Sequence, residues 1–145
     1  MNILVAVDLS DATAKVIEAA RGVAKLTGVK IFVLHVAEPD PDFIGYEAGP
    51  DAVRRHITEA LHHEQTAVQA LAEDLREEGL EASGLLILGP TVDTTLKEAD
   101  RLGAGLIVIG SHGHGALYDA LVGSYSAGII RKSKLPVLVV PVKDS

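Results

Sequence analysis

The feature that most constrains this chain is the alternation of short β-branched runs with longer stretches of helical periodicity. The first run, residues 3–7, is apolar without interruption, as expected for a strand that is covered on both faces. A strand–helix–strand repeat of this kind favours a parallel sheet with helices on both sides. The expected strands are residues 3–7, 29–36, 85–88, 106–109 and 137–140. The sequence therefore predicts an α/β fold with three layers, α/β/α, around one five-stranded parallel sheet.

Four helical segments connect these strands. Ser10 or Asp11 is expected to cap the first segment, and Gly28 suits its end because glycine readily adopts the left-handed conformation. The second is expected from Asp51 to Glu78, and at ~1.5 Å per residue it would span roughly 40 Å. Its expected buried stripe consists of Val53, Ile57, Ala60, Leu61, Val68, Leu71, Ala72 and Leu75. The remaining helices are expected at residues 91–102 and 123–132.

Length, charge and cysteine content exclude several classes of protein. A length of 145 residues fits one domain, so we expect a single domain over residues 1–145. A formal net charge of −7 disfavours nonspecific binding to nucleic acid or to anionic membranes. The absence of cysteine removes disulfides, thiol catalysis and thiolate metal sites. The apolar runs are too short to span a bilayer and the start does not read as a signal peptide, so we expect a cytoplasmic location.

A glycine-rich segment follows the fourth expected strand. Gly110 ends that strand, Gly113 follows three residues later, and Gly123 opens the last expected helix beside Ser124. Glycine lets the backbone approach a ligand closely, and the N–H groups of a helix N-terminus attract anions. The hydroxyls of Ser124 and Ser126 are expected to add donors for phosphate oxygens. The spacing indicates a phosphate-binding site, although glycines after strands are also ordinary turn residues.

Two further residues are expected at the same edge of the sheet. In doubly wound sheets, ligands bind beyond the carboxyl ends of the strands, near the point where the strand order reverses. This rule nominates Asp8 and Val36 together with the loop after Gly110. The segment is not a P-loop, because no G-x-x-x-x-G-K-[ST] occurs, and no G-x-G-x-x-G follows the first strand.

Several histidines are weaker candidates for a site. Glu59 and His63 are four residues apart on the long helix and could hold a metal together, but a solvated helix face is the expected arrangement. His112 and His114 belong to the glycine-rich segment, where they are either exposed turn residues or contacts to a ligand. His35, near the end of a strand, is expected to be a structural histidine with satisfied polar atoms.

Taken together, these segments resemble the universal stress protein family over the whole chain. The spacing Gly110-x2-Gly113-x9-Gly123-Ser124 is similar to the ATP-binding signature of that family. The other matching segments read Ile3-Leu4-Val5-Ala6-Val7-Asp8, Leu34-His35-Val36, Gly89-Pro90 and Leu135-Pro136-Val137-Leu138-Val139-Val140-Pro141. The resemblance implies a Rossmann-like, adenine nucleotide alpha hydrolase-like fold with the strand order 3-2-1-4-5.

The resemblance also implies a site for ATP, ADP or AMP. Asp8 and Val36 would hold the adenine–ribose end, Gly110 and Gly113 would line the ribose and the first phosphates, and residues 123–126 would bind the later phosphates, often with Mg²⁺ or Mn²⁺. The implied nucleotide-contacting residues are Ala6, Val7, Asp8, Val36, Gly110, Ser111, His112, Gly113, His114, Gly115, Gly123, Ser124, Tyr125 and Ser126. Catalytic residues and protein ligands to a metal are not expected.

Three departures from the family pattern bear on the ligand. Leu9 stands where many members have Gly or Phe, and His114 stands where many have a basic residue. Neither Lys nor Arg occurs between Gly110 and Ser126, and Asp119 lies within that segment. The phosphates would therefore depend on backbone dipoles, hydroxyls and a metal ion, which leaves open the choice among ATP, ADP and AMP.

Two classes of function are consistent with these residues. The first is a regulatory nucleotide-binding module that acts through a nucleotide-dependent dimer and an unknown protein partner. The second is a slow ATPase or a nucleotidyl-transfer enzyme of the same architecture, although no general base or nucleophile with a positioned partner is evident. A phosphoacceptor receiver domain is excluded because Gly89 follows the third strand, where an aspartate is needed.

The last expected strand is a candidate dimer interface. Val137, Leu138, Val139 and Val140 are apolar on both faces, yet this strand is expected at the edge of the sheet, where free backbone groups must be covered or paired. A two-fold axis would pair the strand with its own copy in the antiparallel direction. The resemblance points to the same homodimer, and the alternative is that residues 142–145 or a loop cover the edge.

Overall fold

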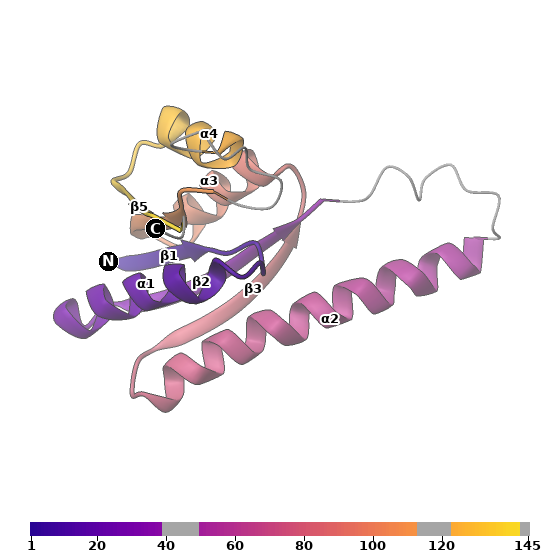
Figure 1. Ribbon diagram of the computed structural model, residues 1–145, viewed down its shortest axis with the longest axis horizontal. Coiled ribbons are helices and arrows are strands. Elements are labelled where there is room, and N and C mark those ends of the chain that lie inside the picture. The colour runs from indigo at the N-terminus through magenta and orange to yellow at the C-terminus, as the bar shows by residue number, and fades with distance from the viewer. Residues whose placement is uncertain (39–49, 113–122, 143–145) are drawn as a thin grey trace.

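The computed structural model describes residues 1–38, 50–112 and 123–142, with the backbone alone for residues 50–57. Its centre is a parallel sheet of five strands in the order β3-β2-β1-β4-β5 (Figure 1). The strands are β1 (Asn2–Ala6), β2 (Lys30–Ala37), β3 (Ala82–Leu88), β4 (Ala104–Gly110) and β5 (Val137–Val140). The strand order implied by the family resemblance is confirmed.

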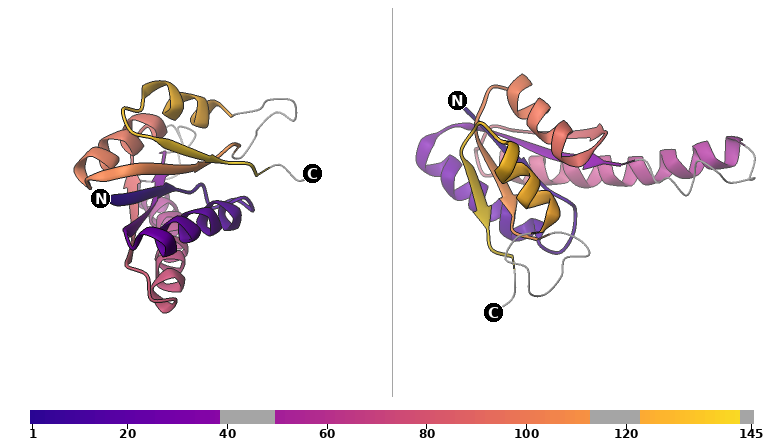
Figure 2. Two further views of the ribbon diagram at one scale, coloured as in Figure 1. Left: turned by 90° about the vertical axis from the view of Figure 1, so that its left-hand side faces the viewer. Right: turned by 90° about the horizontal axis from the view of Figure 1, so that it is seen from above.

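Four helices cover the two faces of this sheet. They are α1 (Thr13–Thr27), α2 (Pro50–Glu77), α3 (Thr91–Arg101) and α4 (Ser124–Lys132). Figure 2 shows α1 and α2 on one face and α3 and α4 on the other, so the three expected layers are confirmed. In the part of the chain that the structure describes, no helix combines the length and the apolar character needed to cross a membrane.

Each face of the sheet has its own core because successive strand residues point to opposite sides. Ile3 and Val5 of β1 pack with the α1 and α2 side chains, in a cluster that includes Leu75. Leu4 and Ala6 of the same strand pack on the side of α3 and α4. The uninterrupted apolar run at the start of the chain is explained by this burial on both faces.

The long helix α2 covers the sheet with only part of its length. Val68, Ala72 and Leu75 are buried, whereas Ala60 is exposed. Figure 1 shows that the N-terminal end of α2 extends beyond the sheet. The predicted buried stripe is therefore confirmed in the C-terminal half and wrong at Ala60, because the sheet is not wide enough to cover that turn. The side chains of Val53 and Ile57 lie outside the described residues.

The predicted boundaries differ most at β3. This strand begins at Ala82 rather than at residue 85, and Ala82 already pairs with Ile31 of β2. Its first part contains Ser83 and Gly84, which are poor strand formers, and the sequence pattern therefore missed it. A Cβ on Gly84 would lie 2.9 Å from the carbonyl oxygen of Val68, so the glycine allows α2 to approach the sheet.

The predicted cap of α1 is wrong. The N-cap residue is Ala12, which makes no side-chain capping bond, instead of Ser10 or Asp11. The hydroxyl of Ser10 donates to Oδ1 of Asp8 at 2.5 Å and accepts from the N–H of Ala12 at 3.3 Å, so this serine lies before the N-cap and joins the start of the helix to the end of β1. At the other end, Gly28 adopts a φ of 72° and its N–H donates to the carbonyl of Ala24, which confirms the predicted stop.

Candidate functional site

The carboxyl ends of β1, β2 and β4 meet at one edge of the sheet. The chain leaves β1 toward β2 on one side, and later returns to place β4 on the other side of β1. The strand order thus reverses between β1 and β4, which is where doubly wound sheets bind ligands. Asp8 follows β1, Val36 is the last but one residue of β2, and Gly110 ends β4.

A tight turn holds the carboxylate of Asp8. Its Oδ1 accepts hydrogen bonds from the backbone N–H of Ser10, at 3.0 Å, and from the Ser10 hydroxyl, at 2.5 Å. Leu9, between them, has a φ of 62°, a left-handed conformation that is costly for leucine. Its side chain packs against the core on the side of α1, and this burial offsets the strain. The turn after β1 is therefore left-handed at a leucine.

His35 connects β2 to the end of β1 and lies close to α2. Its Nδ1 lies 2.9 Å from the carbonyl oxygen of Val7, and since a carbonyl only accepts, Nδ1 carries the proton. Its Nε2 lies 3.6 Å from Oε2 of Glu64 on α2. The backbone N–H of Val7 donates to Leu34, so both backbone polar groups of Val7 are used within the protein. The expectation that His35 is structural is confirmed.

Ser111 connects the end of β4 to three other segments. The residue is buried; its N–H donates to the carbonyl of Val140 in β5, and its carbonyl accepts from the N–H of Gly123 at 2.7 Å. The hydroxyl oxygen accepts from the N–H of Val142 and lies 3.0 Å from Nδ1 of His112. These bonds show that Ser111 holds the segments around the site together.

Gly110 is required by close packing. A Cβ at this position would lie 3.2 Å from Cγ2 of Val16, 3.3 Å from Cγ1 of Val142 and 3.4 Å from the carbonyl oxygen of His112. The carbonyl of Gly110 accepts a 2.6 Å hydrogen bond from the hydroxyl of Ser126. The glycine therefore brings β4, α1 and α4 close together at the edge where the strand order reverses.

The N-terminus of α4 lies at this edge. Gly123 is the N-cap residue in extended conformation and has no side chain to cap the helix, and the first turn contains no acidic residue. Ser124, the first helical residue, is exposed, whereas Ser126 is buried. Since Gly123 is the N-cap, the capping explanation for Ser124 does not apply. The Ser126 hydroxyl, expected to donate to phosphate, donates to Gly110 because it points into the core.

Tyr125 turns its hydroxyl toward α3 instead of toward solvent. The Tyr125 oxygen lies 2.7 Å from Oγ1 of Thr95. Burial raises the pKa of Tyr125 to about 12, and the negative charge of Asp8 contributes in the same direction. The phenol is therefore neutral at physiological pH. Sequence analysis missed Thr95, whose only signal is a threonine at a core-facing position of an amphipathic helix.

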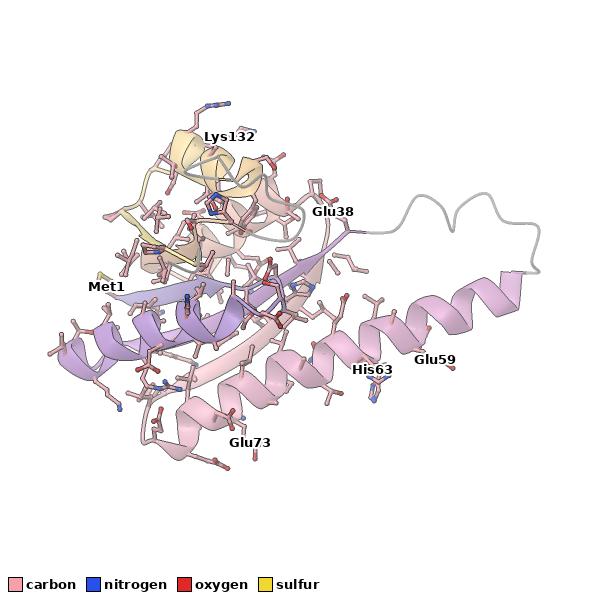
Figure 3. The ribbon with its side chains drawn as sticks, viewed as in Figure 1. Met1, Glu38, Glu59, His63, Glu73 and Lys132 are labelled. Carbon is pink, nitrogen blue, oxygen red and sulfur yellow. The ribbon has the colours of Figure 1, made fainter. Side chains whose placement is uncertain are left out.

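The sequence-derived site residues fall into three groups. Ala6, Val7, Ser111 and Ser126 are buried, Ser124 is exposed, and the half-buried residues at the same edge are Asp8, Val36, Gly110, His112, Gly123 and Tyr125. Gly113, His114 and Gly115 lie outside the described residues. Glu59 and His63, the weak metal candidates, are exposed on the side of α2 that faces away from the sheet (Figure 3). Among residues 1–38, 50–112 and 123–142, no three acidic or histidine side chains gather to hold a metal.

Comparison with known proteins finds matches along almost the whole chain. Residues 1–141 match the model of the universal stress protein family. A relative from Thermus aquaticus, described as a universal stress protein in the QAH/OAS sulfhydrylase 3′ region, is 31% identical over 139 residues, which cover 96% of this chain and 97% of the relative.

Solved structures show the same architecture. The MJ0577 protein of Methanocaldococcus jannaschii superposes with a TM-score of 0.84 at 22% identity, over 99% of this chain and 98% of that one. A universal stress protein from Archaeoglobus fulgidus in complex with dAMP superposes with a TM-score of 0.65 at 26% identity, over 97% of both chains.

Proposed function

Since this chain belongs to the universal stress protein family, we propose that it binds an adenine nucleotide across the carboxyl ends of its central strands. The observation that carries this proposal is the N-terminus of α4, where Gly123 has no side chain to cap the helix, Ser124 is exposed and the first turn lacks acidic residues. Free N–H groups and the helix dipole stabilise an anion at such a position. The phosphates of the nucleotide are the anion that we assign to it.

The two ends of the proposed nucleotide lie on opposite sides of the switch point. The adenine and ribose would contact the β1 and β2 ends, where the carboxylate of Asp8 accepts hydrogen bonds and Val36 offers an apolar surface. The phosphates would run along Gly110 and Gly113 toward Ser124. The dAMP complex of a relative that is 26% identical supports an adenine nucleotide as the class of ligand.

We assign ATP as the preferred nucleotide, with Mg²⁺ or Mn²⁺ on its phosphates. The chain has a net charge of −7 and neither Lys nor Arg between Gly110 and Ser126, so a cation is needed to offset the charge of a triphosphate. The phosphate oxygens would supply the metal ligands, and the exposed hydroxyl of Ser124 would donate to a phosphate oxygen.

The proposed role is regulatory binding and not turnover. Three hydroxyls near the site, those of Ser111, Tyr125 and Ser126, are each hydrogen-bonded within the protein, which suits them to holding its shape. Nucleotide occupancy would then alter the association of this chain with its own copy or with a protein partner. The enzyme alternative predicts sustained formation of ADP or AMP by the purified protein, over many turnovers.

The proposed self-association uses the free edge of β5. The carbonyls of Pro136 and Val140 accept from β4, so by alternation the backbone groups of Val137 and Val139 point to the free edge. Leu138 is 37% exposed beside that edge. A two-fold axis would pair β5 with its own copy and cover these groups. Residues 143–145, the alternative cover, lie outside the described residues.

Two measurements test the proposed function. Calorimetry with ATP, ADP and AMP, with and without Mg²⁺, is expected to show saturable binding, and mass spectrometry of the denatured protein is expected to release an adenine nucleotide. Folded protein that binds none of the three at millimolar concentration would overturn the proposal.

The dimer has its own test. Leu138→Lys should shift the mass measured by light scattering toward the monomer, because it places like charges on both sides of the two-fold axis. Leu26→Lys is the matched control, since Leu26 is 89% exposed on α1 and away from the edge. A wild-type protein that stays monomeric at tens of micromolar contradicts the dimer and leaves the nucleotide proposal standing.

A further inference from the structure

The hydrogen bond between Tyr125 and Thr95 has a defined direction. Oγ1 of Thr95 lies 2.7 Å from the carbonyl oxygen of Thr91, one turn earlier in α3, and a carbonyl only accepts. The single proton of the threonine hydroxyl is thus used, and the Tyr125 hydroxyl must donate to Thr95 across 2.7 Å. The raised pKa of Tyr125 agrees with a phenol that keeps its proton. This proton is therefore directed to α3, away from a ligand at the N-terminus of α4.

Thr95 is fully buried, and its surroundings fix the position of α4. One turn beyond Tyr125, a Cβ on Gly128 would lie 2.8 Å from Cγ2 of Val92, so the two helices are in close contact there as well. The hydrogen bond and the glycine contact are about one helical turn apart on both helices. Together they set both the height and the tilt of α4 against α3.

The N-terminal end of α3, where Val92 contacts α4, is also tied to β2. The N–H of Thr91 lies 3.3 Å from Oε1 of Glu38, which follows β2, and the N–H of Gly89 donates to the carbonyl of Ala37. The helix α3 thus connects the end of β2, proposed to hold adenine, with the start of α4, proposed to hold phosphates. A displacement of α4 along α3 would change the distance between the two ends of the site.

The bonds to β4 act at the same turn of α4 but in another direction. Gly123 donates to Ser111, and the hydroxyl of Ser126 donates to Gly110. These bonds hold α4 against β4, while Tyr125 holds it against α3. Loss of the Tyr125 bond therefore leaves α4 attached to β4 and removes one of the two contacts that fix its position against α3, which allows α4 to tilt about the Gly128–Val92 contact.

We infer that Tyr125 and Thr95 are positioning residues that set how strongly the site prefers ATP to AMP. This inference rests on the proposed nucleotide site and concerns its specificity. The β- and γ-phosphates contact the N-terminus of α4, so their binding depends on where that helix stands. AMP has a single phosphate next to the ribose, and its contacts at Asp8, Val36 and Gly110 do not involve the Tyr125–Thr95 bond.

The test compares ATP and AMP affinities in variants that remove single atoms. Tyr125→Phe removes the donor and keeps the ring, and Thr95→Val removes the acceptor and keeps the shape. Each is expected to weaken ATP binding about fivefold, the equivalent of one ordinary hydrogen bond, and to change AMP binding less than twofold. The double variant should be no weaker than either single variant, because both remove the same bond.

Thr95→Ser is the matched control, because it keeps the hydroxyl and should retain the wild-type ratio of ATP to AMP affinity. A purely structural role would lower the melting temperature and leave this ratio unchanged, and that result overturns the inference. Equal weakening of both nucleotides overturns it too. If the wild-type protein binds neither nucleotide, the proposed function itself has failed, which is distinct from a wild-type protein that binds both while its variants keep the ratio.

Discussion

Two helices, α1 and α4, begin at the edge of the sheet where the proposed ligand binds, and different groups lie near their N-termini. In front of α1 lies the carboxylate of Asp8, which accepts hydrogen bonds from the N–H and the hydroxyl of Ser10. In front of α4 lies Gly123, without a side chain and without an acidic residue in the following turn. The chain thus has its own carboxylate between β1 and α1, whereas the N-cap and the first turn of α4 have none, and we propose that an external anion binds there.

The comparison shows that a helix dipole alone does not make a binding site. Both helices have the same partial positive charge at their N-termini, and both follow a strand of the same sheet. What distinguishes them is the residue that the structure describes near each start, the carboxylate of Asp8 before α1 and the glycine at the N-cap of α4. A carboxylate repels phosphates and suits the hydroxyls of a ribose, whereas an open backbone suits phosphates.

The largest expected effect on ATP affinity comes from placing a carboxylate at the start of α4, as Asp8 does before α1. Gly123 has a φ of −73° and a ψ of 171°, an extended conformation that any residue adopts. Gly123→Asp should therefore fold, and aspartate is a good N-cap. Its carboxylate would occupy the place of the phosphates and is expected to weaken ATP binding by about 100-fold, or about 2.7 kcal/mol, as measured by calorimetry.

Gly123→Asn is the control that separates the effect of side-chain charge on ATP affinity from the effect of side-chain size. Asparagine has nearly the same shape as aspartate and also caps helices, but it carries no charge. We expect Gly123→Asn to retain most of the affinity for ATP. Equal affinities of the aspartate and asparagine variants would show that the N-terminus of α4 does not hold an anion.

The next largest effect on ATP affinity concerns the exposed hydroxyl of Ser124, the first residue of α4. A hydrogen bond to a charged group contributes ~1.5–3 kcal/mol, so Ser124→Ala should weaken ATP binding roughly tenfold or more. Its melting temperature should stay unchanged, because Ser124 is exposed and is not the N-cap. A loss of stability at unchanged affinity would return Ser124 to a structural role.

Ser126→Ala should give the opposite result. Its buried hydroxyl donates to Gly110 at 2.6 Å, and removal of this bond is expected to reduce the free energy of unfolding by about 1 kcal/mol. Affinity for ATP should fall less than in Ser124→Ala. Chemical denaturation and calorimetry on both variants measure the contrast, and equal effects on affinity would show that Ser126 also reaches the ligand.

The smallest expected effect is a dependence of protein stability on pH, which involves Tyr125 in α4 and Asp8 before α1. The pKa of Tyr125 is raised to about 12 by burial and by the charge of Asp8, against an ordinary value near 10. The folded state thus binds more protons than the unfolded state between these values, and stability falls as pH rises through them. The melting temperature of wild type should decline more steeply above pH 10 than that of Tyr125→Phe. Parallel declines would place the phenol in solvent.

The sequence predicted the strands well because their apolar character does not depend on knowing the partner. Residues 137–140 were predicted as the last strand and form β5, and residues 3–7 overlap β1. The wrong boundary of β3 has a tertiary cause. Gly84 and Ser83 extend β3 because α2 needs a glycine beneath Val68, a requirement of packing that leaves no pattern in the chain.

The candidate site was predicted as a list of positions, and their roles needed the structure. The sequence placed Ser124 and Ser126 in one group, but one is exposed and the other donates to Gly110. It offered no reason to select Thr95. A hydroxyl is chemically the same at every position, and only its surroundings decide whether it binds the protein or a ligand.

The amino-acid sequence by itself determined the class of fold, the sequence order of the elements and the region of the site. Those properties follow from hydrophobic periodicity and from glycine spacing, which are local along the chain. The tertiary structure decided the direction of each polar group. Asp8 binds Ser10, Ser111 joins β4 to β5 and α4, and Tyr125 donates to Thr95, 30 residues away in the chain. Such pairings depend on distances between segments that meet only after folding.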